Sequence, residues 1–184
     1  TVPVINGLSN SYHPCQTLAD FMTIKEHKKK LKDLKIAWIG DGNNVCNSLI
    51  FGCSKTQTAI AIATPKGFEP DSEVVEKSSK HTSVDLTIDP ESAVKDADIV
   101  MTDTFTSIHT SDLKQAEKFL PAFQVNDSLM EKAKNDAIFM HCLPAKREQE
   151  VTSSVIDGPQ SVVWDEAENR LHSQKALLLS LLGI

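Results

Sequence analysis

The sequence lacks the features of a membrane-spanning or secreted protein. It contains no run of 18 apolar residues, so no membrane-spanning helix is expected. Its first ten residues, TVPVINGLSN, have neither the basic flank nor the apolar centre of a signal peptide. They also lack an initiating Met, as expected for a processed product, a cloned domain or a fragment.

Cysteine is scarce and is not arranged to bind a metal. The four Cys residues form no C-x-x-C pair and no zinc-ligand spacing. We therefore expect no metal and no cofactor, and free thiols in a reducing compartment, either the cytoplasm or the mitochondrial matrix. Cys46 and Cys53 fall within a helical pattern and are predicted to be small core residues.

The chain has fewer basic than acidic residues, 19 Lys and Arg against 25 Asp and Glu, which gives a net charge of −6. This balance does not favour binding to nucleic acid or to an acidic membrane surface. The one basic run, Lys25–Lys35, alternates with apolar residues, which is typical of the solvated end of a helix.

Short apolar segments alternate with helical patterns along the chain. Because buried parallel strands are nearly continuously apolar, this alternation predicts a single doubly wound α/β domain, Rossmann-like, with a mainly parallel sheet and helices on both faces. We expect long helices near residues 10–34 and 167–183, and a short additional strand at Ser161–Trp164. The five main strands are predicted at Lys35–Gly40, Ala59–Thr64, Val84–Ile88, Asp98–Thr102 and Ala137–Cys142.

Polar residues follow these strands, at the edge where doubly wound sheets bind ligands. They offer carboxylate, carboxamide, hydroxyl, imidazole and thiol groups, which suits a small polar substrate with an amine. The residues are Gly40–Asn44, Pro65–Gly67, Asp103, Thr104, Ser107 and His141–Pro144.

Three other interpretations of these residues remain to be weighed. A dinucleotide site is disfavoured because Val45 stands where G-x-G-x-x-G requires its third glycine. A cysteine hydrolase is disfavoured because His141 and Cys142, as neighbours on a strand, point to opposite faces. The third interpretation is purely structural: a His and a Cys that simply end a strand, and Asp103 as a turn or N-cap residue.

Six motifs, in order and at matching spacing, resemble the aspartate/ornithine carbamoyltransferase family. The resemblance spans nearly the whole chain and is specific to the C-terminal, ornithine-binding domain of the ornithine enzymes. The motifs are His13-Pro14-Cys15-Gln16 with Ala19-Asp20, Trp38–Asn44 (WIGDGNN), Thr64–Pro70 (TPKGFEP), Asp103 with Ser107, Met140–Pro144 (MHCLP) and Asp165–Arg170 (DEAENR).

By this resemblance the reaction is the transfer of a carbamoyl group from carbamoyl phosphate to the δ-amine of L-ornithine, giving citrulline and phosphate. Such acyl transfer relies mainly on positioning and on stabilisation of the oxyanion. The resemblance implies that His13 and Gln16 contact the carbamoyl group and that Arg170 lies on the same side, near the phosphate-bearing substrate.

The resemblance also assigns the ornithine side of the site. Asn44 would hold the amino-acid end of ornithine, and Asp103 would pair with one of its amines. Ser107 would lie in the loop that closes over it. Cys142 and the backbone of Leu143 would lie beside the reacting amine and the carbamoyl oxygen. His141 would orient the structure around them.

The sequence departs from the family in two respects. The phosphate-binding string S-T-R-T-R does not occur, so the carbamoyl-phosphate domain is expected to be absent and the chain to be inactive alone. In the ornithine loop, Ile108 and His109 stand where the family has Met and Gly, and a glycine with positive φ would tolerate no side chain easily.

Three functions are therefore carried forward: an ornithine carbamoyltransferase domain, an inactive scaffold or interaction subunit of a larger assembly, and a carbamoyltransferase for another amino acid or amine. The family implies a trimer for the full-length enzyme. The apolar C-terminal helix, with Leu177, Leu178, Leu181 and Leu182, is expected to be covered by the carbamoyl-phosphate domain or by another protein.

Overall fold

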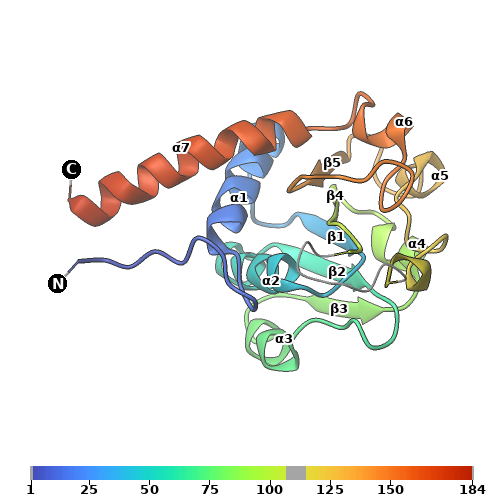
Figure 1. Cartoon of the computed structure of the whole chain (residues 1–184), viewed down its shortest axis with the longest axis horizontal. Coiled ribbons are helices and arrows are strands. Elements are labelled where there is room, and N and C mark those ends of the chain that lie inside the picture. The colour runs from blue at the N-terminus through green and yellow to red at the C-terminus, as the bar shows by residue number, and fades with distance from the viewer. Residues whose placement is uncertain (1, 107–114, 184) are drawn as a thin grey trace.

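A computed structural model describes residues 2–106 and 115–183 and shows one sheet of five parallel strands. The strand order is β3-β2-β1-β4-β5 (Figure 1). This confirms the predicted doubly wound α/β fold. The strands are β1 (Lys35–Ile39), β2 (Ala59–Ala63), β3 (Val84–Thr87), β4 (Ile99–Thr102) and β5 (Ile138–His141).

Helices cover both faces of the sheet. Alternate residues of a strand point to opposite faces, so their side chains pack into two separate cores. Ile36 and Trp38 of β1 pack with α1, α2 and α3, whereas Ala37 and Ile39 pack with α4, α5 and α6. Cys46 and Cys53 are fully buried in the first core, as predicted. The helices are α1 (Pro14–Lys28), α2 (Asn44–Thr56), α3 (Ser72–Ser78), α4 (Pro90–Val94), the 3₁₀ helix η1 (Gln115–Lys118), α5 (Asp127–Met130), α6 (Ser153–Ile156) and α7 (Val163–Leu182).

The first long helix is shorter than its predicted range of 10–34. Pro14 occupies its first turn, where the missing N–H costs no hydrogen bond. Lys29 ends it in the left-handed conformation, with φ of 62°, and donates its N–H to the Lys25 carbonyl. The chain then turns so that Leu34 enters the core.

The strand predicted at Ser161–Trp164 is wrong. Ser161 makes a single bridge to Phe139 of β5, and α7 already begins at Val163. The apolar pair Val162 and Val163 is buried because it packs at the start of this helix. Apolar character alone could not distinguish that packing from a sixth strand. The helix then continues to Leu182, packed along α1 (Figure 1).

The strand order reverses between β1 and β4, and this reversal locates the site. From β1 the chain proceeds to β2 and β3 on one side, and then to β4 and β5 on the other. Sheets of this kind bind ligands at such a reversal, beyond the carboxyl ends of the strands, so the loops that follow β1 and β4 mark the candidate site, called the crevice below. Those of the predicted polar residues that the structure describes follow β1, β2, β4 and β5 at this edge.

Gly42, in the loop after β1, is packed against backbone and not against open space. Its N–H donates to the Phe68 carbonyl at 2.8 Å. A Cβ at residue 42 would lie 2.2 Å from the Pro70 nitrogen. The backbone of Phe68–Pro70 fills the space beside this glycine, so the glycine serves packing between two loops.

Replacing Gly42 by Ala is expected to destabilise the fold by about 1–3 kcal/mol, because the loop at Phe68–Pro70 must move away from the new methyl group. Urea unfolding followed by circular dichroism measures this change. Gly7→Ala is the matched control, since no atom lies within 4 Å of a Cβ there. Equal stability of the two variants would contradict the close packing.

Candidate active site

Asp103, the first residue after β4, lies at the centre of the crevice and is 8% exposed. One carboxylate oxygen, Oδ2, accepts a hydrogen bond from the Asn43 side chain at 2.8 Å. The other, Oδ1, accepts the Thr104 N–H at 2.7 Å. The bond from Asn43 joins the loops after β1 and β4, so the carboxylate is fixed at the point where the strand order reverses.

The Cys142 thiol, directly after β5, donates to Asp103 Oδ1 across 3.2 Å. Burial and the negative charges of Asp103 and Glu166 raise the pKa of this thiol well above its ordinary value. Cys142 is therefore a protonated donor at neutral pH and is poorly suited to act as a nucleophile.

His141, the last residue of β5, is fully buried and holds the following loop in shape. Its Nδ1 accepts the Leu143 N–H at 2.9 Å, so its Nε2 carries the proton of the neutral ring and faces Glu150 Oε1 at 3.3 Å. The same Glu150 oxygen accepts the Lys146 N–H. Leu143 has φ of 53°, a conformation that these bonds maintain. The prediction that His141 orients its neighbours is confirmed.

A potential metal-ligand group coincides with these residues. Within the described part of the chain, Asp103, His141 and Cys142 each offer one ligand atom, and these atoms lie within 4.8 Å of one another. However, both ring nitrogens of His141 are engaged, and the thiol of Cys142 retains its proton. Hydrogen bonds therefore account for the grouping.

A second polar group, from α1 and α7, faces the same edge. Arg170 Nη1 donates to Gln16 Oε1 at 2.6 Å, and Gln16 is 1% exposed. Burial and the Arg170 charge lower the pKa of His13, so its imidazole is neutral at pH 7, although the Asp103 carboxylate acts in the opposite direction. His13 Nδ1 and Arg170 Nε are buried without hydrogen-bond partners among residues 2–106 and 115–183.

Two residues of the predicted ornithine side need separate comment. The Asn44 side chain, at the start of α2, donates to the Ser9 carbonyl at 2.8 Å, so its contact with an amino acid stays a prediction. Ser107 lies outside the described residues, as do Ile108 and His109.

Asn43 and Asp41 also belong to this edge; the sequence placed them among the strand-end polar residues but assigned neither an individual role. Asn43 caps α2 by accepting the N–H groups of Val45 and Cys46, and its amide nitrogen is then directed toward Asp103. An Asn at the N-cap position immediately after a strand was the available signal. Burial and the nearby Asp103 carboxylate raise the pKa of Asp41 to about 6.

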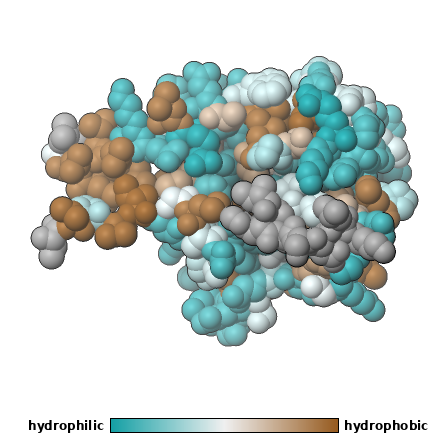
Figure 2. Space-filling view, in the orientation of Figure 1, coloured by the Kyte–Doolittle hydropathy of each residue, from teal (hydrophilic) through white to brown (hydrophobic). Residues whose placement is uncertain are grey.

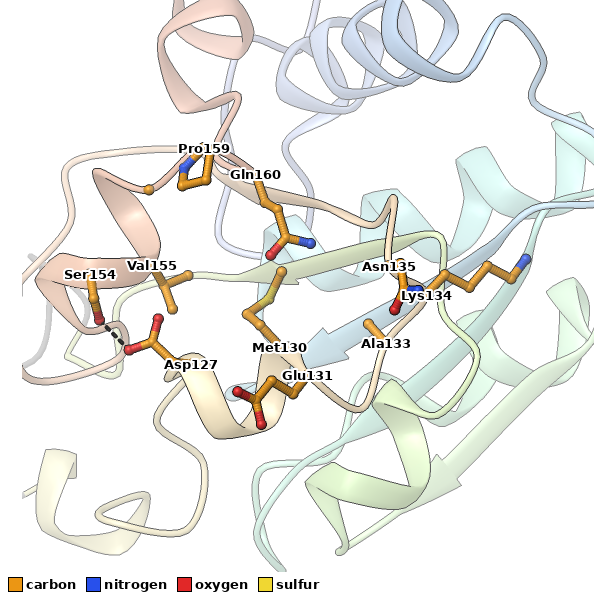
Figure 3. A pocket seen from close by; sticks show the side chains of 11 residues that line it. Asp127, Met130, Glu131, Ala133, Lys134, Asn135, Ser154, Val155, Pro159 and Gln160 are labelled. Carbon is orange, nitrogen blue, oxygen red and sulfur yellow. Dashed lines mark hydrogen bonds between the residues drawn. The ribbon is translucent and has the colours of Figure 1, made fainter.

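A separate cavity of 360 Å³ lies between α5, α6 and the segment before β5, away from this edge (Figure 3). Its wall includes Asp127, which accepts a hydrogen bond from Ser154 at 2.6 Å. None of the predicted site residues lines it. The candidate site is therefore the crevice and not this cavity.

Comparison with protein families decides what kind of crevice this is. Residues 32–181 match the family model of the aspartate/ornithine carbamoyltransferase Asp/Orn binding domain. The chain belongs to the aspartate/ornithine carbamoyltransferase family. Residues 1–26 match the family's second model, that of the carbamoyl-P binding domain.

Individual carbamoyltransferases are similar over the whole chain. An ornithine carbamoyltransferase of Cenarchaeum symbiosum is 64% identical over 181 residues, covering 98% of this chain and 60% of that protein. That of Bacillus subtilis is 53% identical, covering 98% of this chain and 59% of its own length. The structure of ornithine carbamoyltransferase from Pyrococcus furiosus superposes with a TM-score of 0.93 at 49% identity, covering 100% of this chain and 60% of that one. The chain thus spans about 60% of the length of these carbamoyltransferases.

The protonated state of Cys142 predicts slow alkylation. At pH 7.5 we expect iodoacetamide to modify this residue far more slowly than a free thiol, because the raised pKa leaves little thiolate. Asp103→Asn removes one cause of the raised pKa and is expected to speed the reaction. Peptide mass spectrometry measures the rate at Cys142 itself.

Asp85→Asn, on the edge strand β3, is the matched control and should leave the alkylation rate unchanged. Rapid modification of Cys142 in the unaltered protein would contradict the assignment of a protonated thiol.

Proposed function

We propose that this chain is the amino-acid-binding part of an ornithine carbamoyltransferase. The complete enzyme would transfer the carbamoyl group of carbamoyl phosphate to the δ-amine of L-ornithine, releasing citrulline and phosphate. The observation that carries the proposal is the Asp103 carboxylate, fixed by Asn43 at the crevice, in contact with the Cys142 thiol and in electrostatic range of His13. The similarity to enzymes of that name supports it.

The ornithine side of the crevice suits an amine. A carboxylate that accepts from three donors can accept a fourth hydrogen bond from an ammonium or amine, and such charge-assisted bonds are strong. The Leu143 N–H already donates to His141, so Leu143 would offer its carbonyl, an acceptor for the N–H of an amine or a carbamoyl group. Cys142 would act by position and not by covalent attack.

The carbamoyl side suits an oxygen that gains negative charge. The neutral amine attacks the carbonyl carbon and the carbonyl oxygen becomes an oxyanion. Phosphate then departs with the electron pair of the broken C–O bond and takes up the proton that the amine nitrogen releases. Arg170 is the cation on this side, and His13 and Gln16 lie beside it. Groups oriented before the reaction stabilise such an oxyanion at little cost.

The complete enzyme needs a surface to cover the exposed apolar end of α7. Figure 1 shows this end projecting beyond the sheet alongside the N-terminal segment, and Figure 2 shows apolar residues gathered on both. Leu177 is partly buried and lines a groove with Tyr12 and Phe51. We propose that the carbamoyl-phosphate-binding domain covers this surface, in a trimer. The exposed apolar residues are Val2, Val4, Ile5, Leu8, Leu171, Leu178, Leu179, Leu181 and Leu182.

No described helix is both long enough and apolar enough to cross a membrane. The compartment stays a prediction, and so does the expectation that the chain is inactive alone.

Calorimetric titration with L-ornithine, in the presence and absence of carbamoyl phosphate, tests the function. Asp103→Asn is expected to weaken ornithine binding about 10- to 100-fold, because one charge-assisted hydrogen bond is lost. Citrulline formation by the complete enzyme should fall with it. Asp85→Asn, which changes an exposed carboxylate on β3, should bind ornithine normally.

The outcomes separate the three functions carried from the sequence. A folded protein that gives no heat with either ligand would support the scaffold function and overturn this proposal. Binding of another amino acid or amine in preference to ornithine would assign the crevice to a different carbamoyltransferase.

The apolar surface generates a separate prediction. In the complete protein, Leu178→Ser with Leu182→Ser should weaken packing between the two domains and lower the midpoint of thermal unfolding. In the 184-residue chain, where both leucines are largely exposed, the same pair should leave stability nearly unchanged. A similar fall in the midpoint of thermal unfolding in both proteins would contradict this prediction and show that the leucines stabilise α7 itself.

A further inference from the structure

A buried polar cluster joins α1 to α7 directly behind the crevice. Gln16 and Asp20 come from α1, and Glu166 comes from α7. Asp20 and Glu166 are fully buried, and Gln16 is 1% exposed. Two carboxyl groups without solvent are costly unless each is hydrogen-bonded and their charge is reduced. Their retention in a helix–helix contact therefore calls for a physical reason.

The cluster fixes which way the Gln16 carboxamide points. Its Nε2 donates to Asp20 Oδ1 at 2.8 Å and to Glu166 Oε1 at 3.2 Å. Only the NH₂ end of a carboxamide can donate to two carboxyl groups, so the oxygen end must face the other way. That oxygen accepts a hydrogen bond from the Arg170 guanidinium, on the side of the crevice.

The two buried carboxyl groups meet at the Gln16 Nε2, and one of their oxygens has no donor in the described part of the chain. Asp20 Oδ2 is buried, and no N–H or hydroxyl group among the described residues donates to it. The shared Gln16 donor brings the Asp20 and Glu166 carboxyl groups together, and a proton held by one of them would make that carboxyl a donor to the other. Glu166 Oε2 accepts the His141 N–H at 2.9 Å, so the same pair is tied to the end of β5.

The charges around the pair favour retention of this proton. Asp103 adds negative charge from the loop after β4, the thiols of Cys53 on α2 and Cys142 after β5 lie nearby, and Arg170 is the opposing positive charge. Burial is the dominant cause, and together with mutual repulsion it raises the pKa of the pair well above that of a free carboxyl.

We propose that Asp20 and Glu166 are positioning residues, a carboxyl pair sharing one proton that holds the Gln16 carboxamide with its oxygen toward the carbamoyl group. The pair reaches the reaction only through Gln16 and the His141 backbone. The kinetic consequence rests on the proposed function, in which Gln16 contacts the carbamoyl group, whereas the shared proton does not.

Asp20→Asn is a sharp test because it preserves both the hydrogen bonds and the charge. The Asn Oδ1 can still accept from Gln16, and its NH₂ can replace the shared proton as donor to Glu166. The pair carries one negative charge in the unaltered protein and one in this variant. Asp20→Ala removes the partner of Gln16 and leaves Glu166 alone.

Infrared difference spectroscopy on the protein tests the shared proton without any assay of activity. At pH 7 the unaltered protein should show the C=O band of a protonated buried carboxylic acid, and Asp20→Asn should lack it. Absence of this band from the unaltered protein would overturn the shared proton.

The pH dependence of the free energy of unfolding gives an independent test of the shared proton. Between pH about 4, where a free carboxyl titrates, and the raised pKa of the pair, the native state holds a proton that the unfolded state has lost. Stability of the unaltered protein should therefore fall relative to Asp20→Asn as pH rises through this window. A constant difference between them would contradict the shared proton.

Kinetic measurements on the complete enzyme then test whether Asp20 and Glu166 position the Gln16 carboxamide. Asp20→Ala is expected to lower kcat/KM for carbamoyl phosphate at least about tenfold, and Asp20→Asn to recover it to within about threefold. Affinity for L-ornithine should change much less, because Asp103 is untouched. Equal loss in the two folded variants, or no loss in Asp20→Ala, would overturn the positioning role. A protein with the infrared band but no carbamoyltransferase activity would instead overturn the proposed function.

Discussion

Burial of a parallel sheet on both faces is the constraint from which the rest of this structure follows. With apolar side chains directed into two cores, polar groups have room only where the strands end. All five strands run in the same direction, so these ends form one edge. The reversal of strand order between β1 and β4 then opens that edge, and Asp103 and Asn43 meet across the opening.

The site is notable for negative charge held in a dry environment. Asp103, Asp41, Asp20 and Glu166 lie close enough to influence one another, and Arg170 provides the nearby positive charge. Each carboxyl is accommodated differently. Asp103 accepts hydrogen bonds from three donors, Asp41 has a pKa raised to about 6, and burial raises the pKa of both Asp20 and Glu166. An ammonium substrate entering this crevice would add positive charge where it is scarce.

The end of β5 gives two adjacent residues, His141 and Cys142, different surroundings. His141 is fully buried, and Glu150 and the Leu143 N–H occupy both of its ring nitrogens. Cys142 points toward Asp103. The alternation of side chains along a strand produces this division, which is why neither residue can act as base for the other.

Much of this protein follows from its sequence alone. Apolar runs of strand length separated by helical patterns determined the fold class, and strand-end positions identified Asp103 and Cys142, because burial of backbone and side chain leaves few alternatives. The positions of the helix ends were predicted less well. Lys29 ends α1 and Val163 begins α7 because of local backbone conformation and packing, which an apolar pattern does not record. Only the tertiary structure decided that Asn43 reaches Asp103, that His141 turns inward, and that Asp20 meets Glu166 across 146 positions of sequence. Those contacts join residues far apart in the chain, and electrostatics in a dry interior depends on distances that a sequence does not contain.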